Sequence, residues 1–267
     1  MCQISRYYQV ARCYRDEGSR PDRQPEFTQL DIELSFTDGQ KIQNLVEELL
    51  IQSWPTKITK TPFLRLTYHE AMSKYGSDKP DLRISNDIQN VAFHEEKFIK
   101  ALVFEKSQLS KDLSKSAAKS IEKDIKKQFE STIISFFEID NNCDIKTNAN
   151  KLLPRQDSLN LKVNSGDFGF LALGPEEIKV QQSLGKIRSL LIENNYLTVN
   201  SDQLEFLWVI DFPMFLPKEN GEDGLEAAHH PFTRPNDEDI HLLKIHPEQI
   251  RAQHYDLGIK RFWIDFS

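Results

Sequence analysis

The sequence has few cysteines and lacks any apolar run long enough to cross a membrane. Its three cysteines, Cys2, Cys13 and Cys143, are odd in number and have no CxxC spacing, so we expect reduced thiols rather than disulfides or structural zinc. No apolar stretch approaches the roughly 18 residues of a membrane-spanning helix. Residues 1–8 show neither a secretory leader nor a transit-peptide pattern. We therefore expect no membrane association.

The composition is that of a soluble globular protein. The 267 residues are 39% hydrophobic and carry 34 Lys and Arg against 41 Asp and Glu, a formal net charge of -7. This length suits one large or two modest domains. The acidic total argues against a surface coated in nucleic-acid-binding charge, while leaving room for a local basic groove.

Two extended runs open the chain. Residues 7–17 and 26–36 flank a polar, Pro-containing stretch, which predicts a long-looped antiparallel hairpin. The second run alternates, and the face that we expect to be core carries Leu30, Ile32, Leu34 and Phe36. The capping-box pattern at residues 37–40 and the helical spacing that follows predict an amphipathic helix to about Ser53. This helix could cover the apolar strand face.

A short strand and a short helix follow. The spacing predicts a strand over residues 62–66, then a helix that begins at a capping box of Thr67 and Glu70 and ends at Gly76. Near the other end of the chain, the strongly apolar residues 206–212 predict a buried strand.

The middle of the chain has a different character. We predict a Lys-rich helix over residues 105–128, a loop over 140–154, and a helix over 176–193. Between the last two, residues 158–174 suggest one or two strands, with Gly166 and Gly169 as breakers. This middle segment is expected to be a separate α+β unit. Its lysines suit a solvated helix face, with an RNA contact as the alternative.

A polar floor is the first candidate site. If the hairpin pairs in the right register, one face joins two sets of side chains: Gln9, Ala11, Cys13, Arg15 and Glu17 from the first run, and Gln29, Asp31 and Glu33 from the second. An arginine fork can hold a phosphate or carboxylate, and a carboxylate can hold an ammonium group. An exposed, salt-bridged sheet face is the alternative. Arg20, Arg23 and Gln24 in the loop could reach phosphates or an RNA end.

Four blocks of sequence carry a resemblance to a known family. The stretch 12–33, including RCYRDE and RQPEFTQLDIE, resembles motif 2 of the class II aminoacyl-tRNA synthetases in their aspartate-specific bacterial and organellar form. The blocks YGSDKPDLR (75–83), FLWVIDFP (206–213) and AHHPFT (228–233) match in the family's order. The resemblance covers about residues 6–257 and is loose in the middle segment.

The resemblance implies a fold and an arrangement of domains. The fold would be α+β, a mixed, mainly antiparallel class II synthetase sheet with flanking helices, incomplete here, plus an inserted α+β domain. Residues 1–83 would be the motif 2 part of the catalytic domain and residues 84–202 the insertion. Residues 203–257 would continue the catalytic domain, and residues 258–267 would form a divergent tail.

The resemblance also implies an activity, in which aspartate and ATP form aspartyl-adenylate and the aspartyl group then passes to tRNA. Arg15 would bridge the aspartate carboxylate and the α-phosphate as the catalytic residue. ATP would be held by Arg15, Asp16, Glu17 and Gln24, and aspartate by Arg15, Gln29, Asp31 and His229. Asp256 matches a carboxylate associated with the Mg²⁺ that accompanies ATP. His229 and His230 are adjacent, so they face opposite ways in an extended segment and do not readily share a metal.

The match also breaks in places. The anticodon-reading barrel, motif 1 and the motif 3 arginine have no counterparts in the sequence, so we expect a region truncated at both ends with little or no ligase activity of its own. The family is homodimeric, but dimerisation of this piece is doubtful without motif 1. Resemblance favours a mitochondrial location. A non-catalytic nucleotide-binding, RNA-binding or regulatory fragment is the alternative, and an incomplete gene model is a third possibility.

Overall fold

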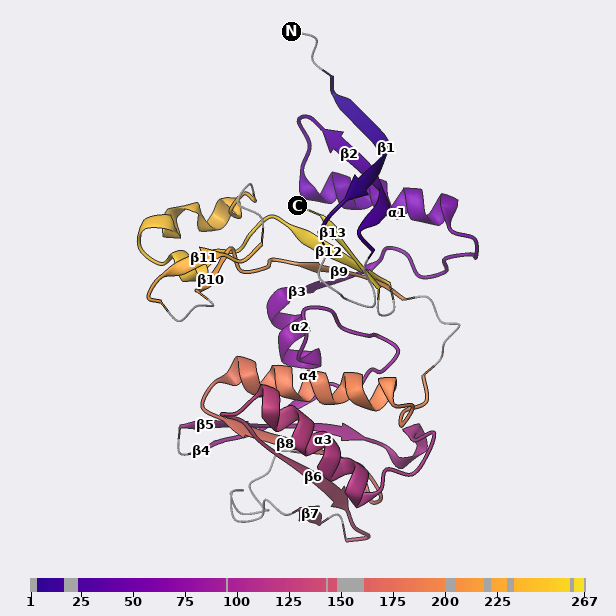
Figure 1. Ribbon diagram of the computed structural model, residues 1–267, viewed down its shortest axis with the longest axis vertical. Helices are drawn as coiled ribbons and strands as arrows, with labels where there is room; N and C mark the ends of the chain where they lie inside the picture. Colours follow the sequence, from indigo (N-terminus) through magenta and orange to yellow (C-terminus); the bar gives the residue numbers. More distant parts are fainter. Residues whose placement is uncertain are drawn as a thin grey trace. The chain divides into compact units, whose positions relative to one another are not determined.

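The computed structural model describes residues 4–16, 24–94, 96–142, 144–147, 161–199, 205–218, 222–229, 233–259 and 262–266 (Figure 1). The chain divides into two compact units, residues 1–57 and 58–267. No helix within these described stretches combines the length and apolar composition that a membrane crossing needs.

The first unit contains the predicted hairpin and helix. Strand β1 (Arg6–Tyr14) pairs antiparallel with β2 (Glu26–Leu34), and helix α1 (Gly39–Ser53) follows. The helix begins one residue later than the capping box predicts. Its N-cap is Asp38, whose carboxylate accepts a hydrogen bond from the Lys41 backbone N–H at 2.9 Å. A carboxylate at this position also interacts favourably with the positive end of the helix dipole, which a threonine hydroxyl does not match.

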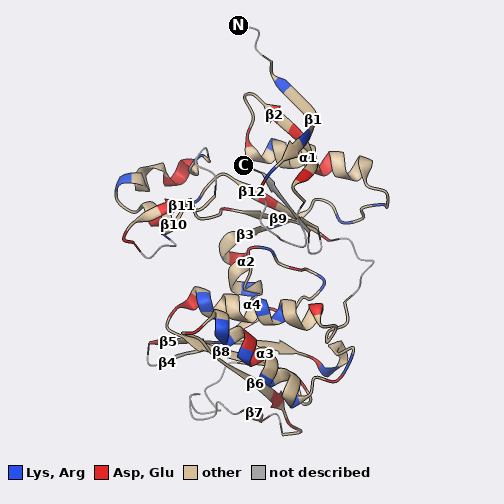
Figure 2. Ribbon diagram, viewed as in Figure 1, with Lys and Arg blue, Asp and Glu red and all other residues tan. Residues whose placement is uncertain are grey.

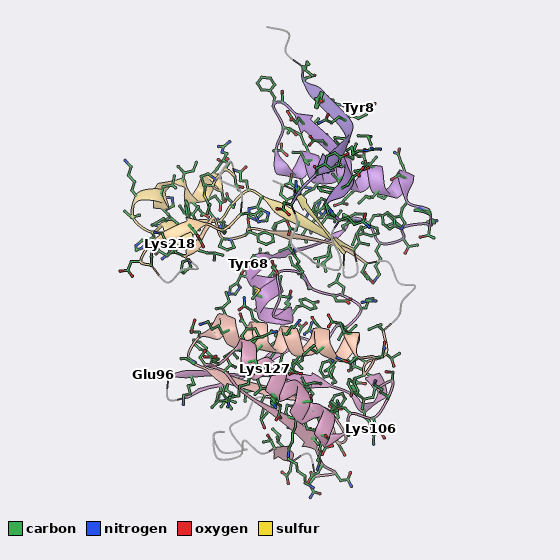
Figure 3. All side chains as sticks on the ribbon, viewed as in Figure 1. Tyr8, Tyr68, Glu96, Lys106, Lys127 and Lys218 are labelled. Atoms are coloured by element: carbon green, nitrogen blue, oxygen red, sulfur yellow. The ribbon has the colours of Figure 1, made fainter. Side chains whose placement is uncertain are left out.

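The expectation that the apolar face of β2 is core is wrong. Leu30 is 50% exposed and Phe36 is 93% exposed. On the same face, Tyr8 of β1 is 73% exposed and its position is marked in Figure 3. A two-stranded sheet has no second layer of its own, and α1 buries Gln43, Val46 and Glu47 instead of covering these side chains.

The second unit holds a four-stranded sheet. Its strands are β3 (Leu64–Thr67), β9 (Phe206–Ile210), β12 (Tyr255–Ile259) and β13 (Phe262–Phe266), in the order β13-β12-β9-β3. Strand β3 is parallel to β9, and the other pairs are antiparallel. Helix α2 (Tyr68–Tyr75) starts at the predicted capping box of Thr67 and Glu70 and ends at Gly76, whose φ is 68°. A small core, including Ala71, Leu207 and Val209, joins α2 to the sheet.

The same unit holds a five-stranded antiparallel sheet. Its order is β4 (Ile88–His94), β5 (Lys97–Phe104), β8 (Phe168–Gly174), β6 (Ile133–Ile139) and β7 (Ile145–Thr147). Helices α3 (Lys115–Gln128) and α4 (Glu177–Glu193) cover one face of this sheet (Figure 1). The core beneath them includes Phe104, Ile125, Phe170 and Leu184, each fully buried. The mainly antiparallel α+β class is therefore confirmed.

Two predictions in this region are wrong in detail. Residues 105–128 do not form one helix, because Lys106–Gln108 is a 3₁₀ turn, η1, and α3 begins after Ser114. The Ser114 hydroxyl accepts a hydrogen bond from the Ala117 N–H, so a new N-cap competes with continuous helix. Strand β7 lies inside the predicted 140–154 loop.

The two glycines predicted as breakers have different roles. Gly166 has a φ of 88° and precedes β8, as predicted for a break. Gly169 lies inside β8, where a Cβ would come within 2.3 Å of the Leu102 carbonyl oxygen. Gly169 therefore allows close strand packing rather than ending the strand.

The two ends of the stretch that contains the five-stranded sheet both contact η1, which lies within that stretch. The side-chain amides of Asn86 and Gln108 exchange two hydrogen bonds, at 3.0 and 2.8 Å. The Thr198 N–H donates to the Gln108 carbonyl at 2.8 Å. Residues before β4 and after α4 thus meet at one turn.

The remaining described elements of this unit are short. Strands β10 (Phe215–Pro217) and β11 (Leu225–Ala227) form a small hairpin. Two 3₁₀ segments, η3 (Asp237–Lys244) and η4 (Pro247–Gln249), precede β12. Arg251 ties this region together through hydrogen bonds to Asp239 and Glu238.

Candidate functional site

The polar face of the hairpin forms in the anticipated register. Gln9 lies opposite Asp31, and its Nε2 donates to the Asp31 carboxylate at 3.1 Å. Gln29 lies two residues before Asp31 on β2, and its Oε1 accepts a hydrogen bond from the Cys13 thiol at 3.1 Å. Both substrate-contact candidates on β2 are therefore oriented by partners on β1, and the paired strands present a continuous polar row.

Arg15 lies where β1 ends, at one end of this row. Its backbone N–H donates to the Pro25 carbonyl at 2.9 Å, which continues the hairpin pairing by one residue. Its guanidinium carbon is 5.4 Å from the centroid of the Phe27 ring, a cation–π distance. Among the described residues, no carboxylate forms an ion pair with Arg15. The exposed fork is thus positioned by stacking and open to an anionic ligand.

The loop residues are only partly described. Asp16 and Gln24 are exposed at the two ends of the loop. Glu17, Arg20 and Arg23 lie outside the described residues. Nothing in the structure tests the predicted contacts of Asp16, Glu17 and Gln24 with the nucleotide, and these contacts remain predictions.

His229 belongs to a column of aromatic rings in the second unit. It stacks on His254 with ring centroids 4.4 Å apart and planes 7° apart. His254 in turn stacks on Phe212 at 4.6 Å, and Phe212 contacts Tyr68 at 5.3 Å. His229 is exposed, while His254 is 3% exposed. The column therefore holds the exposed His229 imidazole against a buried aromatic ring. His230 lies outside the described residues.

No pattern in the sequence marked His254 as part of the site. Its ring partners come from separate segments at residues 68, 212 and 229, so no periodic spacing links them. Only the tertiary fold brings these rings together.

Asp256 lies on β12, opposite Val209 of β9, and is 2% exposed. A carboxylate oxygen is the donor type that Mg²⁺ prefers, and Mg²⁺ is commonly held by one or two carboxylates together with substrate phosphates. Within the described residues, no group of three or more His, Cys, Asp or Glu is arranged to hold a metal ion. Asp256 thus fits Mg²⁺ in donor chemistry, but its burial means that a nucleotide-bound ion would require local opening.

The family model described as tRNA synthetases class II (D, K and N) matches residues 1–263, so the match continues past residue 257, where we expected similarity to stop. The chain is 40% identical over 285 residues to the mitochondrial aspartate–tRNA ligase of Bos taurus, covering 95% of this chain and 42% of that protein.

Further relatives are human and bacterial. The mitochondrial aspartate–tRNA ligase of Homo sapiens is 40% identical over 277 residues, covering 95% of this chain and 43% of that protein. The aspartate–tRNA ligase of Listeria welshimeri is 36% identical over 286 residues, covering 98% and 46%. The chain spans less than half the length of these curated relatives. From the match over residues 1–263, the chain belongs to the class II tRNA synthetases of the D, K and N group.

Proposed function

We propose that the chain is part of the catalytic region of an aspartate–tRNA ligase, which activates aspartate with ATP and transfers it to tRNA. The proposal is carried by the polar face of the hairpin, where Arg15 and the Asp31 carboxylate lie on one side of the sheet and Arg15 has no ion pair with any described residue. Opposite charges at two points on one face suit a substrate with a carboxylate at one end and an ammonium group at the other. The names of the relatives support aspartate as that substrate.

Arg15 would provide the electrostatic part of adenylate formation. Its planar fork can bind the aspartate carboxylate and the α-phosphate of ATP together, which holds the attacking oxygen near phosphorus. As that bond forms and pyrophosphate leaves, the fixed positive charge stabilises the negative charge on the phosphoryl oxygens. Stacking on Phe27 would reduce the reorganisation that this task requires.

Asp31 and Gln29 would receive the amino group of aspartate. Gln9 donates to Oδ2 of Asp31, which leaves Oδ1 to accept from the substrate ammonium. Cys13 donates to one lone pair of Gln29 Oε1, and the second lone pair of this oxygen remains to accept from the substrate ammonium. These β1 side chains are therefore proposed as positioning residues.

The other candidate residues would complete the two-step reaction. Asp16, Glu17 and Gln24 would hold the nucleotide, and His229 would close over the aspartate side before transfer to the terminal ribose of tRNA. Mg²⁺ would accompany ATP and neutralise phosphate charge, held by Asp256 and the phosphates themselves. The protein groups discussed above do not depend on that ion for their own hydrogen bonds.

We further propose the organisation and setting of the parent enzyme. Residues 1–83 and 203–257 would be catalytic, residues 84–202 an inserted domain and residues 258–267 a tail. Mitochondrial relatives favour a mitochondrial location, although bacterial relatives match at similar identity. The family resemblance supports a homodimer.

Binding of a non-hydrolysable aspartyl-adenylate analogue, measured by calorimetry, tests the proposal. Arg15→Ala should weaken binding about 10- to 100-fold, the range for loss of a charge-assisted contact. Arg12→Ala is the matched control, because Arg12 lies on the opposite hairpin face and pairs with Glu26 at 3.3 Å. Equal effects of the two substitutions, or no binding by the unmodified chain, would contradict the proposed site.

A further inference from the structure

A cavity of about 580 Å³ lies between the stretch that follows α2 and the helix α4, within the 58–267 unit. One wall includes Ser77, Lys79 and Arg83, and the other includes Arg188, Ser189 and Glu193. Part of the first wall belongs to the YGSDKPDLR block, to which the proposed aspartate and ATP sites assign no role. Figure 2 shows basic segments among acidic ones on α4 and on the nearby chain after α2.

Arg188 is the most unusual residue of this cavity. It is 3% exposed, and its Nη2 donates to the carbonyls of Asn86, at 2.5 Å, and Lys74, at 3.3 Å. Its guanidinium carbon lies 5.0 Å from the Tyr75 ring centroid. Among the described residues, its Nε and Nη1 have no hydrogen-bond acceptor. One end of the guanidinium is therefore fixed to backbone, and the remaining donors are unsatisfied.

An unsatisfied guanidinium is costly to bury. Arginine does not lose its proton under ordinary conditions, so the charge itself remains. Burial lowers the pKa of Arg188 to about 10, which still leaves the group charged at neutral pH. Buried donors normally have a protein, water or ion partner, and an ionic partner satisfies both the hydrogen bonds and the charge.

The neighbouring charges favour an anion as that partner. The side chain of Arg83 is already held by both oxygens of Asp81. Lys79 is exposed, and its ammonium has no ion pair among the described residues. With Glu193 included, the lining has three cations and two carboxylates, and Asp87, which also acts electrostatically on Arg188, lies outside the lining. Among the described residues, the Lys79 ammonium therefore lacks an ion pair, and two donors of Arg188 lack a hydrogen-bond acceptor.

We propose that this cavity binds a phosphate group through Lys79 and through Arg188, whose buried Nε and Nη1 become available after a small local opening, with the hydroxyls of Ser77 and Ser189 as further donors. Phosphate is favoured because a planar guanidinium, an ammonium and hydroxyls together match an anion with several acceptor oxygens. The phosphate can come from a free anion or from an RNA backbone, which have this chemistry in common. The inference does not depend on the proposed aspartate site, because all of its residues lie outside the hairpin.

Equilibrium dialysis of the full chain against labelled inorganic phosphate tests the inference. We expect millimolar binding that Lys79→Gln weakens about fivefold, the upper range for an exposed ion pair. The control is Lys119→Gln, which removes the same charge from an exposed position on α3. Arg188→Met should abolish binding, provided that its thermal transition remains cooperative. If that variant does not fold, the comparison of Lys79→Gln with Lys119→Gln still shows whether the cavity binds phosphate.

A second arm identifies the source of the phosphate. A short single-stranded RNA without terminal phosphates is titrated into the same variants. RNA binding that inorganic phosphate displaces and Lys79→Gln weakens would assign the cavity to backbone phosphate. Phosphate binding without RNA binding would assign it to a free anion. Absence of phosphate binding at millimolar concentration, or equal weakening by both lysine substitutions, would overturn the proposal.

Discussion

Gly76 and Gly185 meet backbone to backbone. A Cβ added to Gly185 would lie 2.2 Å from the carbonyl oxygen of Gly76, and one added to Gly76 would lie 2.0 Å from the Gln181 carbonyl oxygen. Gly76 also has a φ of 68°, which ends α2 in a conformation that glycine adopts readily. The contact joins the end of α2 to the middle of α4 at a distance that no side chain permits.

Gly185→Ala should therefore destabilise the chain. The added methyl forces the two backbones apart, and overpacking of this kind costs about 2 kcal/mol. Urea denaturation gives the change in the free energy of unfolding. Lys186→Ala, at the next position of the same helix, should change it by no more than about 0.5 kcal/mol. Equal stability of the Gly185 variant and the unmodified chain would show that the backbones separate freely.

Asp31→Asn should weaken binding of the aspartyl-adenylate analogue about tenfold or more, because an amide carries no charge to offset the ammonium. Calorimetry on the variant measures the loss. Glu33→Gln is the matched control, since Glu33 follows Asp31 on the same hairpin face and has no proposed contact. An analogue without the amino group should bind both Asp31 forms equally. A persisting difference would mean that the substitution acts through the fold instead.

Asp239 should contribute pH-dependent stability. The Arg251 guanidinium donates to both oxygens of Asp239, at 2.7 and 2.9 Å, and lowers its pKa to about 2. The carboxyl of the unfolded chain titrates near an ordinary value of about 3.9, so the stabilisation is fully present above that pH. It is lost as the pH falls toward the folded-state pKa.

Asp239→Asn should therefore be less stable at pH 6 by about 1 kcal/mol, a figure reduced for the partial exposure of Arg251. The difference from the unmodified chain should shrink between about pH 4 and pH 2. Urea denaturation across this range measures it. A difference that stays constant with pH would attribute the effect to packing rather than to charge.

His254→Ala should release the His229 ring from its stacked position. His229 loses a partner 4.4 Å away, so its ring-proton NMR signals should move toward random-coil positions. His254→Phe should largely keep the stacked shift, because an aromatic face remains. His246→Ala serves as a control, since that exposed ring pairs with Glu248 outside the column. Unchanged His229 signals in His254→Ala would rule out the stack in solution.

Local patterns in the sequence predicted much of the secondary structure. Helix α4, strand β9 and the capping box at Thr67 follow from apolar spacing and hydrogen-bonding side chains that act within a few residues. Alternation placed Gln29 and Asp31 on one face of the second strand, and the structure supplies the register that joins this face to Gln9. The residue roles came from the family resemblance and remain predictions.

The features that the sequence did not predict depend largely on contacts between residues distant in the chain. Strands β4, β5 and β6 were not anticipated. In β5, residues 99–104 are buried on both faces of the sheet, so the alternation that marks a half-exposed strand is absent. The break before α3 depends on competing hydrogen bonds of Gln108 with Asn86. Arg188 was not singled out, since its partners at residues 74 and 86 are about a hundred positions away in the chain.

The five-stranded sheet belongs to a self-contained stretch, residues 86–198, here called the cassette. Its two ends, Asn86 and Thr198, both bind Gln108 of η1. Because its first and last residues are hydrogen-bonded to the same turn, a change in the length of the cassette need not move β3 or β9. A short linker between Asn86 and Thr198, which both contact Gln108, could replace the stretch between them. Evolution could therefore vary this part of the chain in size while the four-stranded sheet keeps its pairing.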